Sequence, residues 1–166
     1  HWPPIVAERR AAIAVWAKHD TPPALGPVPE IIDDPAIVML WGITRESLDS
    51  WLQAADAGDS KELKGFAASR GVVEGTARIV KSVDEISKLC DGDILVCQVT
   101  NPTWSPIFSR ISAAVSDIGG SMSHAAIVAR EYGLPAVVGT GTATRRIPDG
   151  ARIRVDGGRG IVTILD

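Results

Sequence analysis

The sequence predicts an α/β protein built in layers. Along residues 61–166, short apolar runs rich in Val, Ile and Ala alternate with segments of helical character, and glycine or proline separates them. Strand, helix, strand, helix, strand and then a hairpin is the order typical of a layered domain with a mixed sheet. Apolar residues make up 45% of the 166, so the chain can bury a substantial core.

Residues 1–60 differ from the rest and are predicted to form a small helical, proline-rich connector. Residues 6–18 have helical character, and the prolines of residues 22–29 then predict a stiff, extended stretch. A second helical region begins at Asp34-Pro35, and residues 45–55 carry an apolar stripe. The glycine at the start of residues 58–61 predicts a hinge, which divides the chain into the connector, residues 1–60, and a main domain, residues 61–166.

Four of the five tryptophans lie in the connector: Trp2, Trp16, Trp41 and Trp51. We expect them to anchor the small helices on the main domain or on a neighbouring domain. An aromatic pocket for a substrate is the alternative.

Strands of the main domain are predicted where apolar runs lie between turn residues. They cover residues 63–67, 76–80, 94–97, 113–116 and 136–138, with residues 71–75 as a tight connection between the first two. Residues 153–155 and 161–165 form a final hairpin around a glycine-rich turn.

Three helices are predicted between these strands. One covers residues 83–89, another begins at Asn101, and an alanine-rich helix runs from about residue 123 to residue 132. Gly133 supplies a left-handed cap for the last helix, and Pro135 prevents its continuation.

Composition argues against several classes of function. The net charge of −3 offers no basic face for nucleic acid, and the longest apolar runs are too short to span a membrane. Cys90 and Cys97 have no metal-binding spacing, so no metal site is expected. We expect both to be buried, apolar side chains of a protein in a reducing compartment, the cytoplasm.

His124 is the strongest candidate for chemistry. It follows Gly119, Gly120, Ser121 and Ser123 and opens the alanine-rich helix. The positive end of a helix disfavours the imidazolium cation, and a neutral imidazole is a nucleophile. The same end would stabilise a phosphoryl group carried by the ring, with the two glycines allowing close approach and the two serines capping the helix or donating to phosphate oxygens.

Other chemistries lack residues that they need. No nucleophile elbow, Walker A lysine motif or cluster of metal ligands is present, and the sequence from Gly139 to Thr144 lacks the third glycine of a dinucleotide loop. We therefore expect no ATP site within this chain. The local residues leave open a histidine that only caps its helix.

The sequence from Gly119 to Gly139 resembles the phosphohistidine domain of the phosphoenolpyruvate-utilising enzymes. This family includes pyruvate phosphate dikinase, phosphoenolpyruvate synthase, rifampin phosphotransferase and phenylphosphate synthase. The resemblance extends over residues 62–165 and includes residues 71–75, 92–95, 103–106 and 149–157. It implies a swivelling β/β/α domain in which His124 is the phosphocarrier, with transfer expected at Nε2. Ser123 stands where many members have threonine, which keeps the hydroxyl.

The resemblance also implies partners. An ATP-grasp nucleotide domain or subunit would transfer the β-phosphoryl of ATP to His124, giving AMP and phosphate. An acceptor domain would pass the phosphoryl to a small-molecule hydroxyl or enol. ATP and Mg²⁺ would bind the partner domain, and this domain would bind no cofactor. A carrier that passes phosphoryl from phosphoenolpyruvate to another protein, like enzyme I, and a non-catalytic interaction module are the alternatives.

Overall fold

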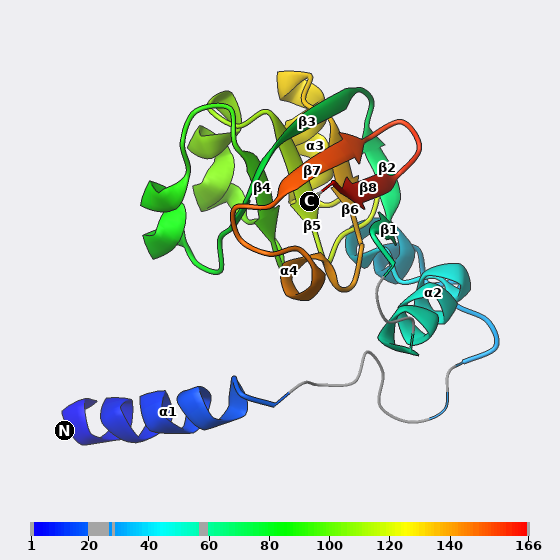
Figure 1. The fold of residues 1–166 in the computed structure, drawn as a ribbon. Coiled ribbons are helices and arrows are strands. Elements are labelled where there is room, and N and C mark those ends of the chain that lie inside the picture. Colours follow the sequence, from blue (N-terminus) through cyan, green and yellow to red (C-terminus); the bar gives the residue numbers. More distant parts are fainter. Residues whose placement is uncertain (1, 20–26, 28, 57–59, 166) are drawn as a thin grey trace.

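An eight-stranded mixed sheet forms the body of the protein (Figure 1). The computed structural model describes residues 2–19, 27, 29–56 and 60–165. The strand order in the sheet is β1-β8-β7-β3-β4-β5-β6-β2. The strands are β1 (Glu62–Lys64), β2 (Phe66–Ser69), β3 (Val72–Ile79), β4 (Ile94–Cys97), β5 (Ala113–Ser116), β6 (Ala136–Val138), β7 (Arg152–Asp156) and β8 (Ile161–Ile164).

The sheet curls until its two edges meet. Strands β3, β4, β5 and β6 are parallel, and antiparallel strands flank them on both sides. The edge strands β1 and β2 are separated in the sequence by Gly65 alone. A Cβ at Gly65 would lie 2.6 Å from the carbonyl oxygen of Val138, so this junction has no room for a side chain. The antiparallel half therefore folds over one face of the parallel half.

Two apolar clusters make three layers. In β4, whose residues are all buried, Ile94 and Val96 belong to a cluster shared with the antiparallel strands β7 and β8, whereas Leu95 and Cys97 face a cluster shared with helices. The period of two in a strand explains this division, because successive side chains point to opposite faces. The order is β layer, β layer, helical layer, and the predicted β/β/α fold is confirmed.

The helical layer consists of α3 (His124–Tyr132) and the 3₁₀ helices η2 (Val83–Lys88) and η3 (Pro102–Ser109), while α4 (Ala143–Arg146) packs on the other cluster. In α3, Ala125, Ala126 and Ala129 are buried, and their small side chains let the helix lie close to the sheet. Gly133 ends it with φ +67°, as predicted.

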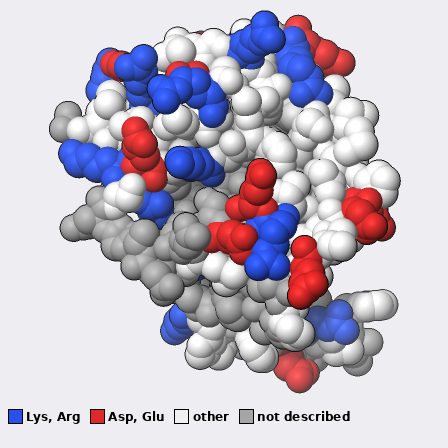
Figure 2. Space-filling model, turned by 90° about the vertical axis from the view of Figure 1, so that its right-hand side faces the viewer, with Lys and Arg blue, Asp and Glu red and all other residues white. Residues whose placement is uncertain are grey.

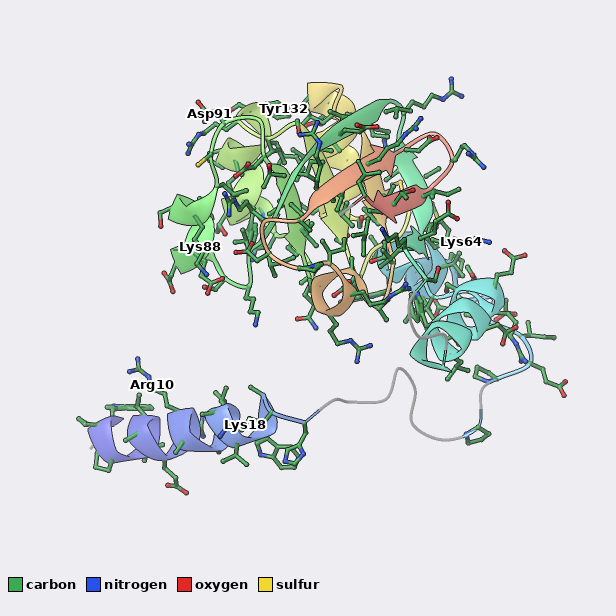
Figure 3. All side chains as sticks on the ribbon, viewed as in Figure 1. Arg10, Lys18, Lys64, Lys88, Asp91 and Tyr132 are labelled. Carbon is green, nitrogen blue, oxygen red and sulfur yellow. The ribbon has the colours of Figure 1, made fainter. Side chains whose placement is uncertain are left out.

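The N-terminal region has one part that is exposed and one part that packs on the main domain. All residues of α1 (Trp2–Trp16) are exposed, and the helix lies apart from the sheet (Figure 1), with side chains such as Arg10 projecting from it into solvent (Figure 3). In contrast, the π-helical turn η1 (Ile37–Trp41) and α2 (Arg45–Asp56) lie against the main domain. Of the four tryptophans, Trp51 anchors α2 by donating from Nε1 to the carbonyl of Gly139 at 3.1 Å, whereas Trp2 and Trp16 are exposed.

Two sequence-based predictions are wrong. Residues 72–75 are part of the long strand β3 rather than a tight connection, because β2 pairs with β6 and β3 pairs with β4 and β7. Cys90 is exposed, since it lies in the turn before β4, whereas Cys97 is buried within that strand. Residues 58 and 59 of the predicted hinge at 58–61 lie outside the described residues.

Charged side chains of both signs are interspersed on the face shown in Figure 2, with basic ones gathered along its upper edge. No helix in the described part of the chain combines the length and apolar character needed to cross a bilayer.

Candidate functional site

His124 is the first residue of α3, at the carboxyl edge of the parallel strands. Ser123 caps the helix: its backbone is extended and its Oγ accepts from the N–H of Ala126 at 3.4 Å. Helix termini at this edge of an α/β sheet are common places for ligand sites. The cap fixes the direction of the helix start, and with it the direction in which the imidazole projects.

The imidazole is held on both sides by hydroxyl groups. Thr100 Oγ1 lies 2.9 Å from Nδ1, and Ser105 Oγ lies 3.2 Å from Nε2. The buried ring of Phe108 meets the imidazole edge-on, with ring centroids 6.2 Å apart. These three side chains come from η3 and the residues that connect it to β4, so the ring orientation is set by a segment about twenty positions upstream.

Partial burial lowers the pKa of the His124 imidazole, and the carboxylate of Glu131 opposes this shift. The position at a helix start acts in the same direction as burial, because the helix dipole disfavours a cation there. The neutral imidazole therefore predominates at neutral pH, and only this form has a lone pair for nucleophilic attack.

The glycine loop before His124 is bound to η1. The N–H groups of Gly119, Gly120 and Met122 donate to the carbonyl oxygens of Trp41, Leu40 and Met39 at 3.2, 3.1 and 2.9 Å. The sequence predicted that Gly119 and Gly120 let the backbone approach a phosphate closely. In this structure the N–H groups of both residues donate to η1.

Close packing of glycines makes this contact possible. Gly42 ends η1 with φ +71°, and a Cβ there would lie 2.3 Å from the carbonyl oxygen of Gly119. A Cβ at Gly120 would lie 2.6 Å from the carbonyl oxygens of Met39 and Val38. Gly42 and Gly120 therefore allow close contact between the backbones of η1 and the glycine loop. Contact of Gly119 and Gly120 with a phosphate stays a prediction.

The donors that remain at the helix start are those of His124 and Ala125. Among the described residues, none accepts from their backbone N–H groups. Ser123 has its hydroxyl engaged in the cap, and Ser121 is exposed with its carbonyl accepting from Arg130 Nη2 at 2.8 Å. These two amides, together with the N–H and hydroxyl of Ser121, are thus the groups nearest in sequence that could meet an anion.

A cavity of about 220 Å³ opens beside the ring, lined in part by Leu40, Trp41, Val99 and Thr100. Three large apolar side chains that line it are exposed: Leu40 at 49%, Trp41 at 51% and Val99 at 46%. His124 therefore lies in a small depression with an apolar rim.

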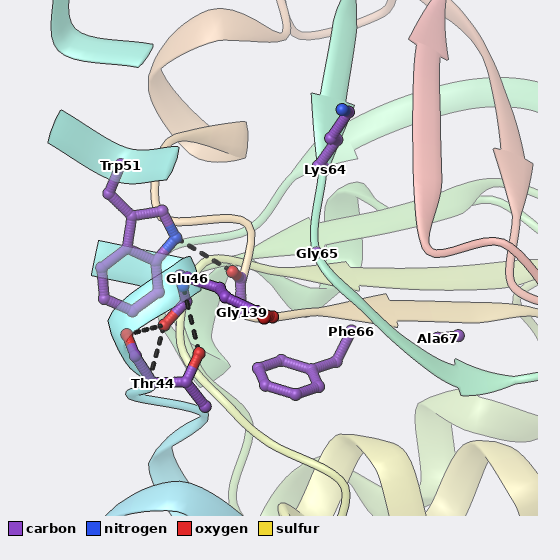
Figure 4. Close-up of a pocket in the computed structure, with 9 residues that line it drawn as sticks. Thr44, Glu46, Trp51, Lys64, Gly65, Phe66, Ala67 and Gly139 are labelled. Carbon is purple, nitrogen blue, oxygen red and sulfur yellow. Dashed lines mark hydrogen bonds between the residues drawn. The ribbon is translucent and has the colours of Figure 1, made fainter. Parts of the chain in front are cut away.

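A larger cavity of about 340 Å³ lies between α2 and the junction of β1 and β2 (Figure 4). Trp51 and Phe66 form its aromatic walls, and Lys64 and Glu46 supply one charge of each sign. His124 does not line this cavity. Ser47 accepts from the N–H of Thr44 at 2.8 Å, which fixes the start of α2 beside it.

Sequence reasoning missed Thr100 and Ser105. A signal was present: residues 100–105 hold four hydroxyl or amide side chains directly after a buried strand. Carboxyl ends of neighbouring parallel strands lie at one edge of a sheet, so this segment had to lie near the residues that follow the next strand. Within the described residues, no group of His, Cys, Asp and Glu side chains could hold a metal ion.

Comparison with known proteins shows which proteins this chain is similar to. A family model described as PEP-utilising enzyme, mobile domain, matches residues 89–160. The chain is 52% identical over 103 residues to rifampicin phosphotransferase of Streptomyces sviceus and 48% identical over 101 residues to phosphoenolpyruvate synthase of Aeropyrum pernix. It is 48% identical over 107 residues to chondramide synthase cmdD of Chondromyces crocatus.

These alignments cover 60–64% of this chain but 12% of the first two relatives and 3% of the third, so the chain spans a small part of each. The matched segment contains β4, β5, β6 and α3 together with Thr100, Ser105 and Phe108, whereas η1 lies outside it. Residues 89–160 therefore match the mobile domain of the PEP-utilising enzymes, the family that the sequence resembles.

Proposed function

We propose that this chain is the phosphohistidine carrier of an ATP-dependent phosphotransferase, with His124 as the residue that is phosphorylated. The observation that carries the proposal is the setting of one neutral imidazole. It stands at a helix start with two uncommitted amides, is oriented by two hydroxyls, and faces an open depression. A histidine that only caps its helix would need none of these features, and in this helix Ser123 is the cap.

In the proposed reaction, the ring nitrogen forms a bond to phosphorus while a P–O bond of the phosphoanhydride breaks. With water, ATP is converted to AMP and inorganic phosphate, and one phosphoryl group stays on His124. The free N–H groups of the helix start stabilise the charge of that group. We expect transfer at Nε2, and the second step passes the phosphoryl to a small-molecule hydroxyl or enol.

Two partner sites are needed for this cycle. An ATP-grasp domain or subunit holds ATP and Mg²⁺, and a further domain or subunit holds the acceptor. The names of two relatives, rifampicin phosphotransferase and phosphoenolpyruvate synthase, support an acceptor of low molecular weight. The apolar rim around His124 is suited to transient docking because it can be covered at either partner site.

The part that moves between partners includes η1 and α2. Three backbone hydrogen bonds and the indole of Trp51 bind this segment to the main domain. A hinge at residues 58–61 would require these bonds to break in every cycle. We therefore place the swivel upstream of η1.

The test uses ATP labelled separately at the β and γ positions, added to this chain together with its nucleotide-binding domain. Acid-labile, base-stable label on His124 from the β position alone is the expected result. His124→Ala should abolish the label and net transfer while the fold is kept, because the side chain is only half-buried. Label from the γ position, or loading by phosphoenolpyruvate and by neither ATP position, would contradict the dikinase reaction, and the latter would favour a protein-to-protein carrier.

A further inference from the structure

Ser105 lies against the nitrogen expected to react. Its Oγ is 3.2 Å from Nε2 of His124 and 2.9 Å from the carbonyl oxygen of Pro102. The 3₁₀ helix that carries it is well anchored, because Asn101 caps its start and Trp104, Ile107 and Phe108 are buried in the core. The hydroxyl is therefore held in place by the fold.

A count of protons favours one arrangement of these groups. A neutral imidazole has one N–H and one lone pair, and each hydroxyl has a single proton to donate. If the ring proton is on Nε2, Thr100 donates to Nδ1, Nε2–H donates to Ser105, and Ser105 donates to the Pro102 carbonyl. Every proton in this chain of hydrogen bonds then has an acceptor.

The opposite tautomer leaves two groups unsatisfied. If the ring proton is on Nδ1, Thr100 accepts it, and no described group other than the imidazole lies within bonding distance of the Thr100 hydroxyl proton. Thr100 is 7% exposed, so solvent gives little compensation. Nε2 would then be an acceptor, and the single hydroxyl proton of Ser105 could be donated either to Nε2 or to the Pro102 carbonyl, but not to both. The resting structure therefore keeps the proton on Nε2 and the hydrogen bond of Nε2 directed to Ser105.

We propose that Ser105 restrains the reaction by covering Nε2 of His124 in the resting state, and that it is displaced when the phosphoryl group is loaded. This inference rests on the proposed function and deepens it. A phosphoryl group bonded to Nε2 would occupy the space where Ser105 Oγ lies. Before attack, the proton leaves Nε2 and Nδ1 takes one up, so that the lone pair is on Nε2. The Nε2–P bond then forms, the P–O bond of the donor breaks with its electron pair going to the leaving oxygen, and the Nδ1 proton passes to solvent. Breaking the hydrogen bond to Ser105 is part of the barrier.

The same helix offers a matched control. Ser109 Oγ donates to the carbonyl of Pro106 at 2.9 Å, the same bond to the third preceding residue that Ser105 makes to Pro102. Ser109 is exposed, and within the described part of the chain its hydroxyl has one hydrogen bond, the one to Pro106. Ser109→Ala therefore removes an equivalent helix contact and leaves the imidazole untouched.

The experiment is chemical phosphorylation of the 166-residue chain by phosphoramidate, which needs no partner domain. The rate at His124 is measured by site-resolved mass spectrometry relative to the rate at exposed His19 on the same chain. Ser105→Ala should raise this ratio about fivefold, the equivalent of about 1 kcal/mol for one hydrogen bond. Ser109→Ala and Ser105→Thr, which keeps the hydroxyl, should leave it at the wild-type value. An unchanged or lower ratio in Ser105→Ala would overturn the proposal.

Nitrogen NMR of the imidazole gives an independent readout. The wild-type ring should show the proton on Nε2, and a ring protonated on Nδ1 would contradict the proposed resting state. Failure of this inference and failure of the proposed function are distinguishable. If no label from ATP reaches His124 in the complete enzyme, the carrier function fails; if label appears but Ser105→Ala matches Ser109→Ala, only the role of Ser105 fails.

Discussion

Substitution of Gly42 by alanine should release η1 from the glycine loop that precedes His124. Gly42 is buried with φ +71°, and the added Cβ would lie 2.3 Å from the carbonyl oxygen of Gly119. That contact is with backbone, so it can be relieved only by moving η1 away. The three hydrogen bonds from Gly119, Gly120 and Met122 would then be lost.

The magnitude follows from two contributions. A left-handed conformation costs an alanine about 1 kcal/mol relative to glycine. Three backbone hydrogen bonds at about 1 kcal/mol each add about 3 kcal/mol. The free energy of unfolding should therefore fall by about 4 kcal/mol in total.

Gly133→Ala is the matched control. Gly133 also caps a helix, with φ +67°, but a Cβ there meets nothing within 4 Å. This variant should lose only the conformational contribution, about 1 kcal/mol. The difference between the two variants isolates the steric release of η1.

Urea denaturation measures both variants, and amide hydrogen exchange locates the change. The N–H groups of Gly119, Gly120 and Met122 should exchange faster in Gly42→Ala and at the wild-type rate in Gly133→Ala. Equal destabilisation of the two variants, with unchanged exchange at these three amides, would refute the reasoning.

Two further predictions concern titration and buried polar contacts. Because burial lowers the folded-state pKa of His124 below the ordinary value of about 6.5, the unfolded chain binds the proton more tightly. The contribution of His124 to stability is then present above about pH 6.5 and is lost as the pH falls towards the folded-state pKa. Urea denaturation as a function of pH should show this slope in the wild type and not in His124→Gln; equal slopes would count against it. Asp117 is 6% exposed and accepts from Thr140 Oγ1 at 3.2 Å and from both the N–H and the hydroxyl of Thr144. In Asp117→Asn an amide N–H₂ replaces one acceptor oxygen, so the free energy of unfolding should drop by about 1–3 kcal/mol. An unchanged free energy of unfolding in this variant would show that these bonds make no net contribution to stability.

Local patterns were enough for most individual elements. The strands at residues 94–97, 113–116 and 136–138 lie where the apolar runs predicted them, because buried parallel strands are continuous apolar segments. The helix that begins at His124 and its cap Gly133 also agree with the sequence, since capping depends on a few adjacent residues. Residues 71–75 were misread because glycines at both ends indicated a turn, whereas the pairing of β3 with β7 keeps them extended.

At the site, too, some features follow from neighbouring residues in the sequence and others from the tertiary structure. The sequence by itself determined which histidine stands at a helix start and which serine can cap that helix, because these are properties of neighbouring residues. Only the tertiary structure decided what touches the imidazole and the glycine loop. Thr100 and Ser105 reach the ring, and η1 takes the amides of Gly119 and Gly120, through contacts between segments 19 to 80 positions apart. Such contacts depend on the order in which parallel strands assemble and on how closely two backbones approach, and neither is encoded in the spacing of nearby residues.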